Sequence, residues 1–186
     1  MPCSLTALTA TTAWPRFNSF KSLRIVNTAT SPTPFNGTAA SLPGAISASD
    51  FDNGGEMVAY HDITLGCTGY CPSRNTDVDT YGNVVLRAFG GEWLKYTVNI
   101  AAAGTYTLSV DVGATVTGQT FHVEFDGVDV TGPLTIPNTG SWSTFQTVTK
   151  TGVGLSSGQK VMRVVIGGSS PADGGFGVSL NTVKLQ

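Results

Sequence analysis

The stretch EWLKYTVNIAAAGTYTLSVDV, residues 92–112, decides the fold, because two runs of alternating apolar and polar residues flank a short Ala-Gly link. The apolar positions of the two runs are Leu94, Tyr96, Val98 and Ile100, then Tyr106, Leu108, Val110 and Val112. A period of two residues is the pattern of a half-buried β-strand, whose side chains point alternately to the core and to solvent. The stretch therefore predicts two consecutive strands.

Three more strands are predicted on the C-terminal side, over residues 120–126 (TFHVEFD), 144–149 (TFQTVT) and 160–166 (KVMRVVI). The first alternates Phe121, Val123 and Phe125 with polar residues and ends at Asp126-Gly127, a dipeptide typical of tight hairpin turns. No window of ten residues has an apolar helical stripe free of Gly, Pro and crowded β-branched residues. Short strands with frequent turn signals predict an all-β fold, a jelly-roll β-sandwich.

The charge balance excludes several classes of partner. The chain has 186 residues, with 10 Lys and Arg, 12 Asp and Glu, and a net charge of −2. A protein that binds nucleic acid or an anionic membrane is expected to carry an excess of basic residues, and this chain has no such excess. Charged residues make up only 12% of the chain, against about a quarter in average proteins, and such a composition is typical of secreted, extracellular β-proteins. The N-terminus lacks the basic and apolar regions of a secretion signal, so we expect any export signal to lie upstream of the chain.

The composition changes near residue 42. Residues 1–41 contain many Thr, Ala, Ser and Pro and no sustained periodicity, which predicts a linker or the remnant of an upstream domain. Residues 42–186 contain all of the predicted strands and are expected to form one domain.

Two of the three cysteines are close in sequence. Cys67 and Cys71 are predicted to form a disulfide that holds the shape of one loop, whereas Cys3 stands alone. A disulfide is typical of an oxidising compartment. His61 and His122 are far apart in sequence, so a zinc site with these cysteines is not expected.

No catalytic residue is predicted. The segment GLSSG, residues 154–158, fits a hydrolase nucleophile pattern, but that motif needs a strand-to-helix turn and here lies between two predicted strands, which favours an ordinary hairpin loop. A glycosidase needs two carboxylates beside the scissile bond. The only glutamates, Glu56, Glu92 and Glu124, have no spacing that indicates such a pair, and Glu124 is expected on a solvated strand face.

Trp142 ends the segment IPNTGSW, residues 136–142, where Pro and Gly favour a fixed, exposed loop. An indole held in this way can serve as a platform, because the apolar C–H faces of sugar rings pack on aromatic rings. The alternative is that Trp142 caps the hydrophobic core.

Five segments together resemble family 6 carbohydrate-binding modules. They are GGEMVAYHD (54–62), RNTDVD (74–79), GGEWLKYTVNIAAAGTYTLSV (90–110), FHVEFDGVDVTGPLTIPNTGSW (121–142) and GQKVMRVVI (158–166). The resemblance covers residues 42–186 and implies a β-jelly-roll module. Such modules are usually attached to a glycoside hydrolase and bind β-glucans, xylan or other plant and algal polysaccharides.

The resemblance also implies a binding cleft in the loops at one end of the sandwich, where a Trp and a Tyr hold a sugar ring. Trp142 matches the tryptophan. The tyrosine normally stands shortly before the arginine of the RNTDVD segment, which indicates Tyr70, with Ser73 as the alternative alignment.

Two further positions match the polar contacts of the family. Glu56 matches a residue that accepts hydrogen bonds from sugar hydroxyls, and a carboxylate makes strong contacts of this kind. An asparagine of the family falls at Ser179, with Asn181 as the neighbouring candidate.

A structural calcium ion is common in the family and is bound partly by an E-A-E pattern. This chain has Ser-Ala-Ser at residues 47–49, so two anionic ligands are missing, while Asp50, Asp52 and Asp173 remain candidate ligands. Calcium binding is therefore left open.

We expect a monomeric, non-catalytic polysaccharide-binding module that targets an attached glycoside hydrolase to its substrate. The alternatives are a small jelly-roll glycosidase or lyase, and a structural or adhesive β-domain. The residues do not distinguish β-1,3-glucan, xylan, cellulose and agar-type chains, and β-1,3-glucan is preferred on the breadth of the family.

Overall fold

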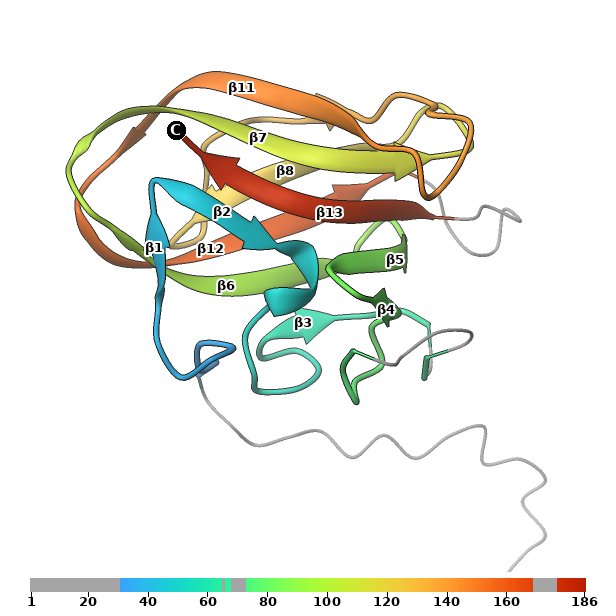
Figure 1. Ribbon diagram of the computed structural model, residues 1–186, viewed down its shortest axis with the longest axis horizontal. Coiled ribbons are helices and arrows are strands. Elements are labelled where there is room, and N and C mark those ends of the chain that lie inside the picture. The colour runs from blue at the N-terminus through green and yellow to red at the C-terminus, as the bar shows by residue number, and fades with distance from the viewer. Residues whose placement is uncertain (1–30, 65, 68–72, 169–176) are drawn as a thin grey trace, which may run out of the picture.

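The computed structural model describes residues 31–64, 66–67, 73–168 and 177–186, which form two β-sheets packed face to face (Figure 1). The first sheet has the order β1-β6-β12-β8-β10, with β3 beside β6 and β9 beside β8. The second has the order β11-β7-β13-β5-β4, with β2 beside β13. This arrangement confirms the predicted all-β jelly-roll sandwich.

The strands of the first sheet are β1 (Ala40–Leu42), β3 (Tyr60–His61), β6 (Trp93–Ile100), β8 (Thr120–Phe125), β9 (Val128–Asp129), β10 (Leu134–Thr135) and β12 (Gly158–Gly167). Those of the second are β2 (Gly44–Ser47), β4 (Thr80–Tyr81), β5 (Val84–Ala88), β7 (Gly104–Ala114), β11 (Gln146–Leu155) and β13 (Val178–Leu185). One 3-10 turn, η1 (Ala48–Asp50), follows β2. Within the described ranges, no helix has the length and apolar character needed to span a membrane.

The segment 92–112 forms β6 and β7, which lie in different sheets and line the same core. Every predicted apolar position of β6 is buried, and so are those of β7 except the half-buried Tyr106. The alternation predicted for residues 120–126 is also confirmed, because Phe121, Val123 and Phe125 of β8 are buried. The hydrophobic core therefore lies between the sheets, and loops form the two ends of the sandwich.

Residues 154–158 connect β11 to β12, which pair in different sheets. The prediction of an ordinary hairpin loop there is wrong, because β11 pairs with β7 while β12 pairs with β6 and β8. Ser156 is exposed in this crossing loop and no helix follows it. The geometry of a hydrolase nucleophile is therefore absent from this segment.

The N-terminal boundary of the packed domain lies before the predicted position at residue 42. β1 starts at Ala40 and pairs in parallel with β6, and Thr33 exchanges backbone hydrogen bonds of 2.8 Å with Asn53. The Asn53 amide donates to the carbonyl oxygens of Pro34 and Phe35. Residues 1–30 lie outside the described ranges, so their role as linker or domain remnant stays a prediction.

Arg74, the arginine of the RNTDVD segment, has a structural role. Its guanidinium donates to the carbonyl oxygens of Ser49 and Phe51, and it lies 3.8 Å from the ring centroid of Phe51 and 4.7 Å from that of Phe35. These contacts join the N-terminal segment, η1 and the loop before β4.

Glu124 does lie on the outer face of β8, but the prediction that it is solvated is wrong. Its side chain is buried and pairs with Arg163 of the neighbouring strand at 2.6 Å and with His122 at 3.2 Å. The strand register brings Arg163 directly beside Glu124, and this pair covers the carboxylate.

Candidate functional site

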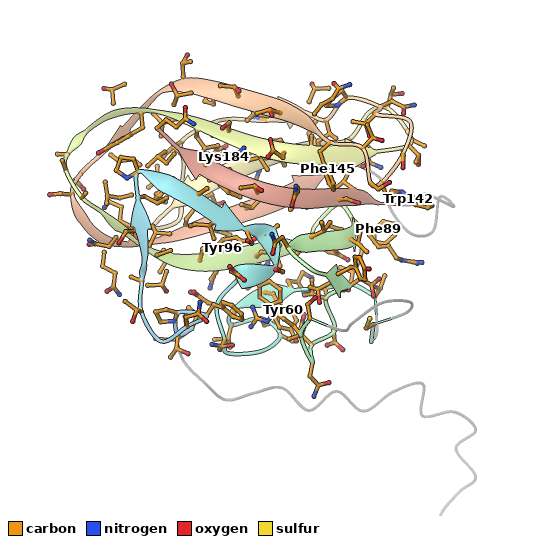
Figure 2. The ribbon with its side chains drawn as sticks, in the orientation of Figure 1. Tyr60, Phe89, Tyr96, Trp142, Phe145 and Lys184 are labelled. Carbon is orange, nitrogen blue, oxygen red and sulfur yellow. The ribbon has the colours of Figure 1, made fainter. Side chains whose placement is uncertain are left out.

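Trp142 lies in the loop between β10 and β11, at the end of the sandwich where β7 ends and β13 begins. Figure 2 shows Trp142 at this end, with Phe145 and Phe89 nearest to it among the labelled side chains and Lys184 farther away along the sheet. Trp142 is 41% exposed, whereas Phe89 is 1% exposed. The indole is therefore held partly out of the protein, and the interpretation that it caps the core is not supported.

The loop that presents Trp142 is fixed by hydrogen bonds to the end of β7. The Thr139 N–H donates to the Ala114 carbonyl oxygen at 2.8 Å, and the Ala114 N–H donates to the Thr139 hydroxyl at 3.0 Å. The Asn138 side chain accepts a hydrogen bond from the Gly140 N–H at 2.8 Å, and Gly140 has a φ of 79°, which glycine adopts readily. A loop ordered in this way loses little conformational entropy when a ligand binds.

Gly113 of β7 allows the backbone of the Trp142 loop to approach β7 closely. This role of Gly113 was not predicted from the sequence. A Cβ atom at residue 113 would lie 3.0 Å from the carbonyl oxygen of Trp142 and 3.1 Å from that of Thr144. Both neighbours are backbone atoms, so neither can rotate away. The only signal in the sequence is a glycine inside a strand, which is typical of close backbone approach.

Gly113→Ala is expected to displace the Trp142 loop and to weaken glycan binding, with a loss of stability of about 1 to 3 kcal/mol from overpacking. Calorimetric binding and urea unfolding check the two effects separately. Gly154→Ala is the matched control, because a Cβ at residue 154 meets no atom within 4 Å. Equal effects of the two substitutions would show that the loop does not depend on Gly113.

Ser179 of β13 pairs with Gly113 across the β7–β13 ladder, so the structure brings this predicted residue to the base of the Trp142 loop. Its side chain is fully buried, and its Oγ has no hydrogen-bond partner in the described part of the chain. Buried hydroxyl groups usually have a partner. Asn181 is half-buried and falls where the pairing of β13 with β7 shifts.

Glu56 lies in the tight loop before β3 and is buried, with 8% of its surface exposed. One carboxylate oxygen lies 2.5 Å from His61 Nδ1, and the other accepts a hydrogen bond from the Asp62 N–H at 3.0 Å. The His61 ring lies 6.2 Å from that of Trp93. Glu56 therefore holds the β3 segment in place, and a contact between Glu56 and a sugar stays a prediction.

Glu92 and Asp62 form a buried carboxyl pair beside Glu56. The Glu92 carboxylate accepts hydrogen bonds from the backbone N–H groups of Ile63 and Phe89, at 3.1 and 3.0 Å. Burial and the negative charge of Asp62 raise the pKa of Glu92 to about 8, and burial also raises the pKa of Asp62. The pair can thus hold a proton between its two side chains near neutral pH.

Three predicted residues, Tyr70, Cys71 and Asp173, lie outside the described residues. The Cys67–Cys71 disulfide and the contact of Tyr70 with a sugar therefore stay predictions. Ser73, the alternative to Tyr70, is exposed.

Of the three carboxylates predicted as candidate calcium ligands, Asp50 and Asp52 lie within the described residues and Asp173 lies outside them. Asp50 lines a cavity of about 140 Å³ together with Asn36 and Thr97. Both carboxylate oxygens of the neighbouring Asp52 accept hydrogen bonds from Thr97. Nowhere in the described ranges do three acidic, His or Cys side chains form a group able to hold a metal ion. Since Ca²⁺ takes several oxygen ligands and Asp173 is not described, calcium binding stays a prediction from the sequence.

One curated protein has a sequence similar to this chain. Beta-agarase AgaA of Microbulbifer thermotolerans is 30% identical over 121 residues, which are 63% of this chain and 24% of the relative. The chain thus matches about a quarter of the length of that curated protein.

Solved structures share the fold. The C-terminal CBM6 of the marine laminarinase LamC from Zobellia galactanivorans is 21% identical with a TM-score of 0.56, over 77% of this chain and 98% of that one. CBM6cm-2 of lichenase 5A from Cellvibrio mixtus, solved with cellotriose, is 25% identical with a TM-score of 0.53, over 77% of this chain and 96% of that one. The family model "Carbohydrate binding module (family 6)" matches residues 65–181, well over half of the chain. With this match and the jelly-roll sandwich, the chain belongs to the family 6 carbohydrate-binding modules.

Proposed function

We propose that this module binds a neutral β-linked polysaccharide at the Trp142 end of the sandwich and so holds an attached glycoside hydrolase on its substrate. The partly exposed indole on a hydrogen-bonded loop is the observation that supports this most directly. Sugar rings pack on such a face through their C–H groups, and nearby polar atoms fix their orientation.

Agarose and β-glucans are the ligand classes that the relatives support. The matched proteins include an agarase, the module of a laminarinase and a module solved with cellotriose. β-1,3-Glucan remains the first choice, and agarose is tested beside it. We place the parent enzyme outside the cell, because polymers of this size cannot be reached from within.

The family is one of non-catalytic modules, and the glutamates have the positions expected for this role. Glu92, directly before β6, is buried against backbone N–H groups, and Glu124 of β8 is paired with Arg163 on the outer face of the same sheet. Hydrolysis requires two carboxylates about 5 to 10 Å apart with the sugar between them. Glu92 and Glu124 are each buried and already hydrogen-bonded to other protein groups, so neither is placed to act on a sugar.

The contribution of the module to the parent enzyme is local concentration. A single site with one aromatic platform and a few polar contacts is expected to bind with a Kd between about 1 µM and 1 mM, or about 4 to 8 kcal/mol. Tethering converts this modest affinity into a high effective concentration of the attached catalytic domain.

The purified chain is expected to be retarded in native gels that contain laminarin or agarose and to release no reducing ends from either polysaccharide. Gels that contain xylan or hydroxyethylcellulose complete the ligand series. Serum albumin, run in each gel, controls for retardation by viscosity. Failure to bind any of the four would favour the structural or adhesive alternative, and release of reducing ends would favour the enzyme.

A further inference from the structure

Arg87 occupies a β-bulge in β5. Ala88 and Val85 of β5 pair with Val178 and Leu180 of β13, so two intervening residues on β5 oppose the single Ser179 on β13. Arg87 has a φ of 55°, in the left-handed region that non-glycine residues seldom adopt. Bulges of this kind redirect a side chain and are common beside functional sites.

The neighbouring backbone reinforces this conformation. Gly177 has a φ of 66°, and a Cβ at residue 177 would lie 2.8 Å from both the Ala88 carbonyl oxygen and the Arg87 carbonyl carbon. The chain thus places a glycine directly before β13 and a strained arginine on β5. Backbone strain held by its surroundings is concentrated at binding sites.

The bulge lies at the Trp142 end of the sandwich. Ser179 faces the bulge on one side and pairs with Gly113 on the other, and Gly113 lies against the backbone of the Trp142 loop. Adjacent strands are about 4.8 Å apart, so the bulge lies about 10 Å across the sheet from the strand that supports Trp142.

The Arg87 side chain is held loosely. It is 50% exposed, and Nε lies 3.4 Å from Oδ2 of the buried Asp79. By comparison, Arg163 contacts Glu124 at 2.6 Å. An arginine anchored through Nε can still direct its terminal N–H groups and its flat face toward a ligand.

We propose that Arg87 is a second glycan contact, which acts with Trp142 to bind a neutral polysaccharide between an indole and a guanidinium. This inference rests on the proposed function. The guanidinium donates charged hydrogen bonds to sugar hydroxyl and ring oxygens. Asp79 compensates the charge of Arg87, so the site selects an uncharged chain over a uronate or sulfated one.

Arg87→Gly is the decisive variant, because glycine suits the left-handed backbone and the fold is expected to be kept or stabilised. Its affinity for laminarin or agarose, whichever the native chain binds, is expected to fall about 10-fold or more by calorimetry. Arg87→Lys is expected to bind weakly, since it keeps the charge but loses the planar donors. Lys184→Gln is the matched control, a cation of the same sheet distant from Trp142 (Figure 2), and is expected to bind normally.

The outcomes separate this inference from the proposed function. Normal binding by Arg87→Gly together with loss of binding by Trp142→Ala would overturn the role of Arg87 and leave the module function intact. If Arg87→Lys binds with native affinity, and this affinity falls steeply as the salt concentration rises, the proposed recognition of a neutral chain would be overturned. Absence of binding by the native chain would overturn the proposed function itself.

Discussion

Trp142→Ala is expected to lower the affinity for the bound polysaccharide about 5- to 150-fold, the equivalent of about 1 to 3 kcal/mol for one aromatic stacking contact. The melting temperature is expected to stay within about 2 °C of the native value, because the indole is 41% exposed and its loop is held by backbone groups. Starting from a modest affinity, this loss is expected to reduce or remove the retardation in the native gel.

Tyr81→Ala is the matched control, since it removes another exposed ring, on β4, that is not part of the Trp142 loop. We expect this variant to bind normally. Normal binding by Trp142→Ala would place the glycan elsewhere on the module. Unfolding of Trp142→Ala would revive the interpretation that the indole caps the core.

The strands could be predicted from the sequence because their physical cause is local. Alternation in 92–112 and 120–126 decides which side chains face the core, and a pattern two residues long is visible without knowledge of the partner strand. The exposed position of Trp142 could be predicted for a similar reason, because Pro and Gly mark its loop as fixed and exposed.

The remaining parts of the site depend on register between distant strands. Arg87, Gly113 and Ser179 are far apart in the chain and become neighbours only when β5, β13 and β7 align. Glu124 lies on the predicted face and is nevertheless buried, because the register of β12 brings Arg163 beside it. A one-residue slip would change each of these contacts, so a period-two pattern alone could not specify them.

Glu92 connects the segment after β3 to the segment after β5. Its carboxylate accepts the N–H groups of Ile63 and Phe89, and it shares a side-chain hydrogen bond with Asp62. Burial, with the charge of Asp62, raises its pKa from 4.5 to about 8. Between these two values the folded chain keeps a proton that the unfolded chain has released. The free energy of unfolding is therefore expected to fall as pH rises through this range, by at most about 1.4 kcal/mol per pH unit for one proton.

Glu92→Gln is expected to remove this contribution, because the amide mimics the protonated carboxyl group and cannot ionise. Urea unfolding at pH 5, 6.5 and 8 should show a shallower fall in stability for Glu92→Gln than for the native chain. Glu124→Gln, the matched control, removes another buried carboxylate but leaves Glu92 intact, so it should keep the native slope. In Glu92→Gln the side-chain amide nitrogen replaces one acceptor oxygen by a donor, so this variant loses one hydrogen bond from a backbone N–H. Glu92→Gln should therefore be less stable than the native chain by about 1 kcal/mol at pH 5. If Glu92→Gln retains the full native slope, the retained proton resides on another group, with Asp62 as the next candidate, because burial raises its pKa too.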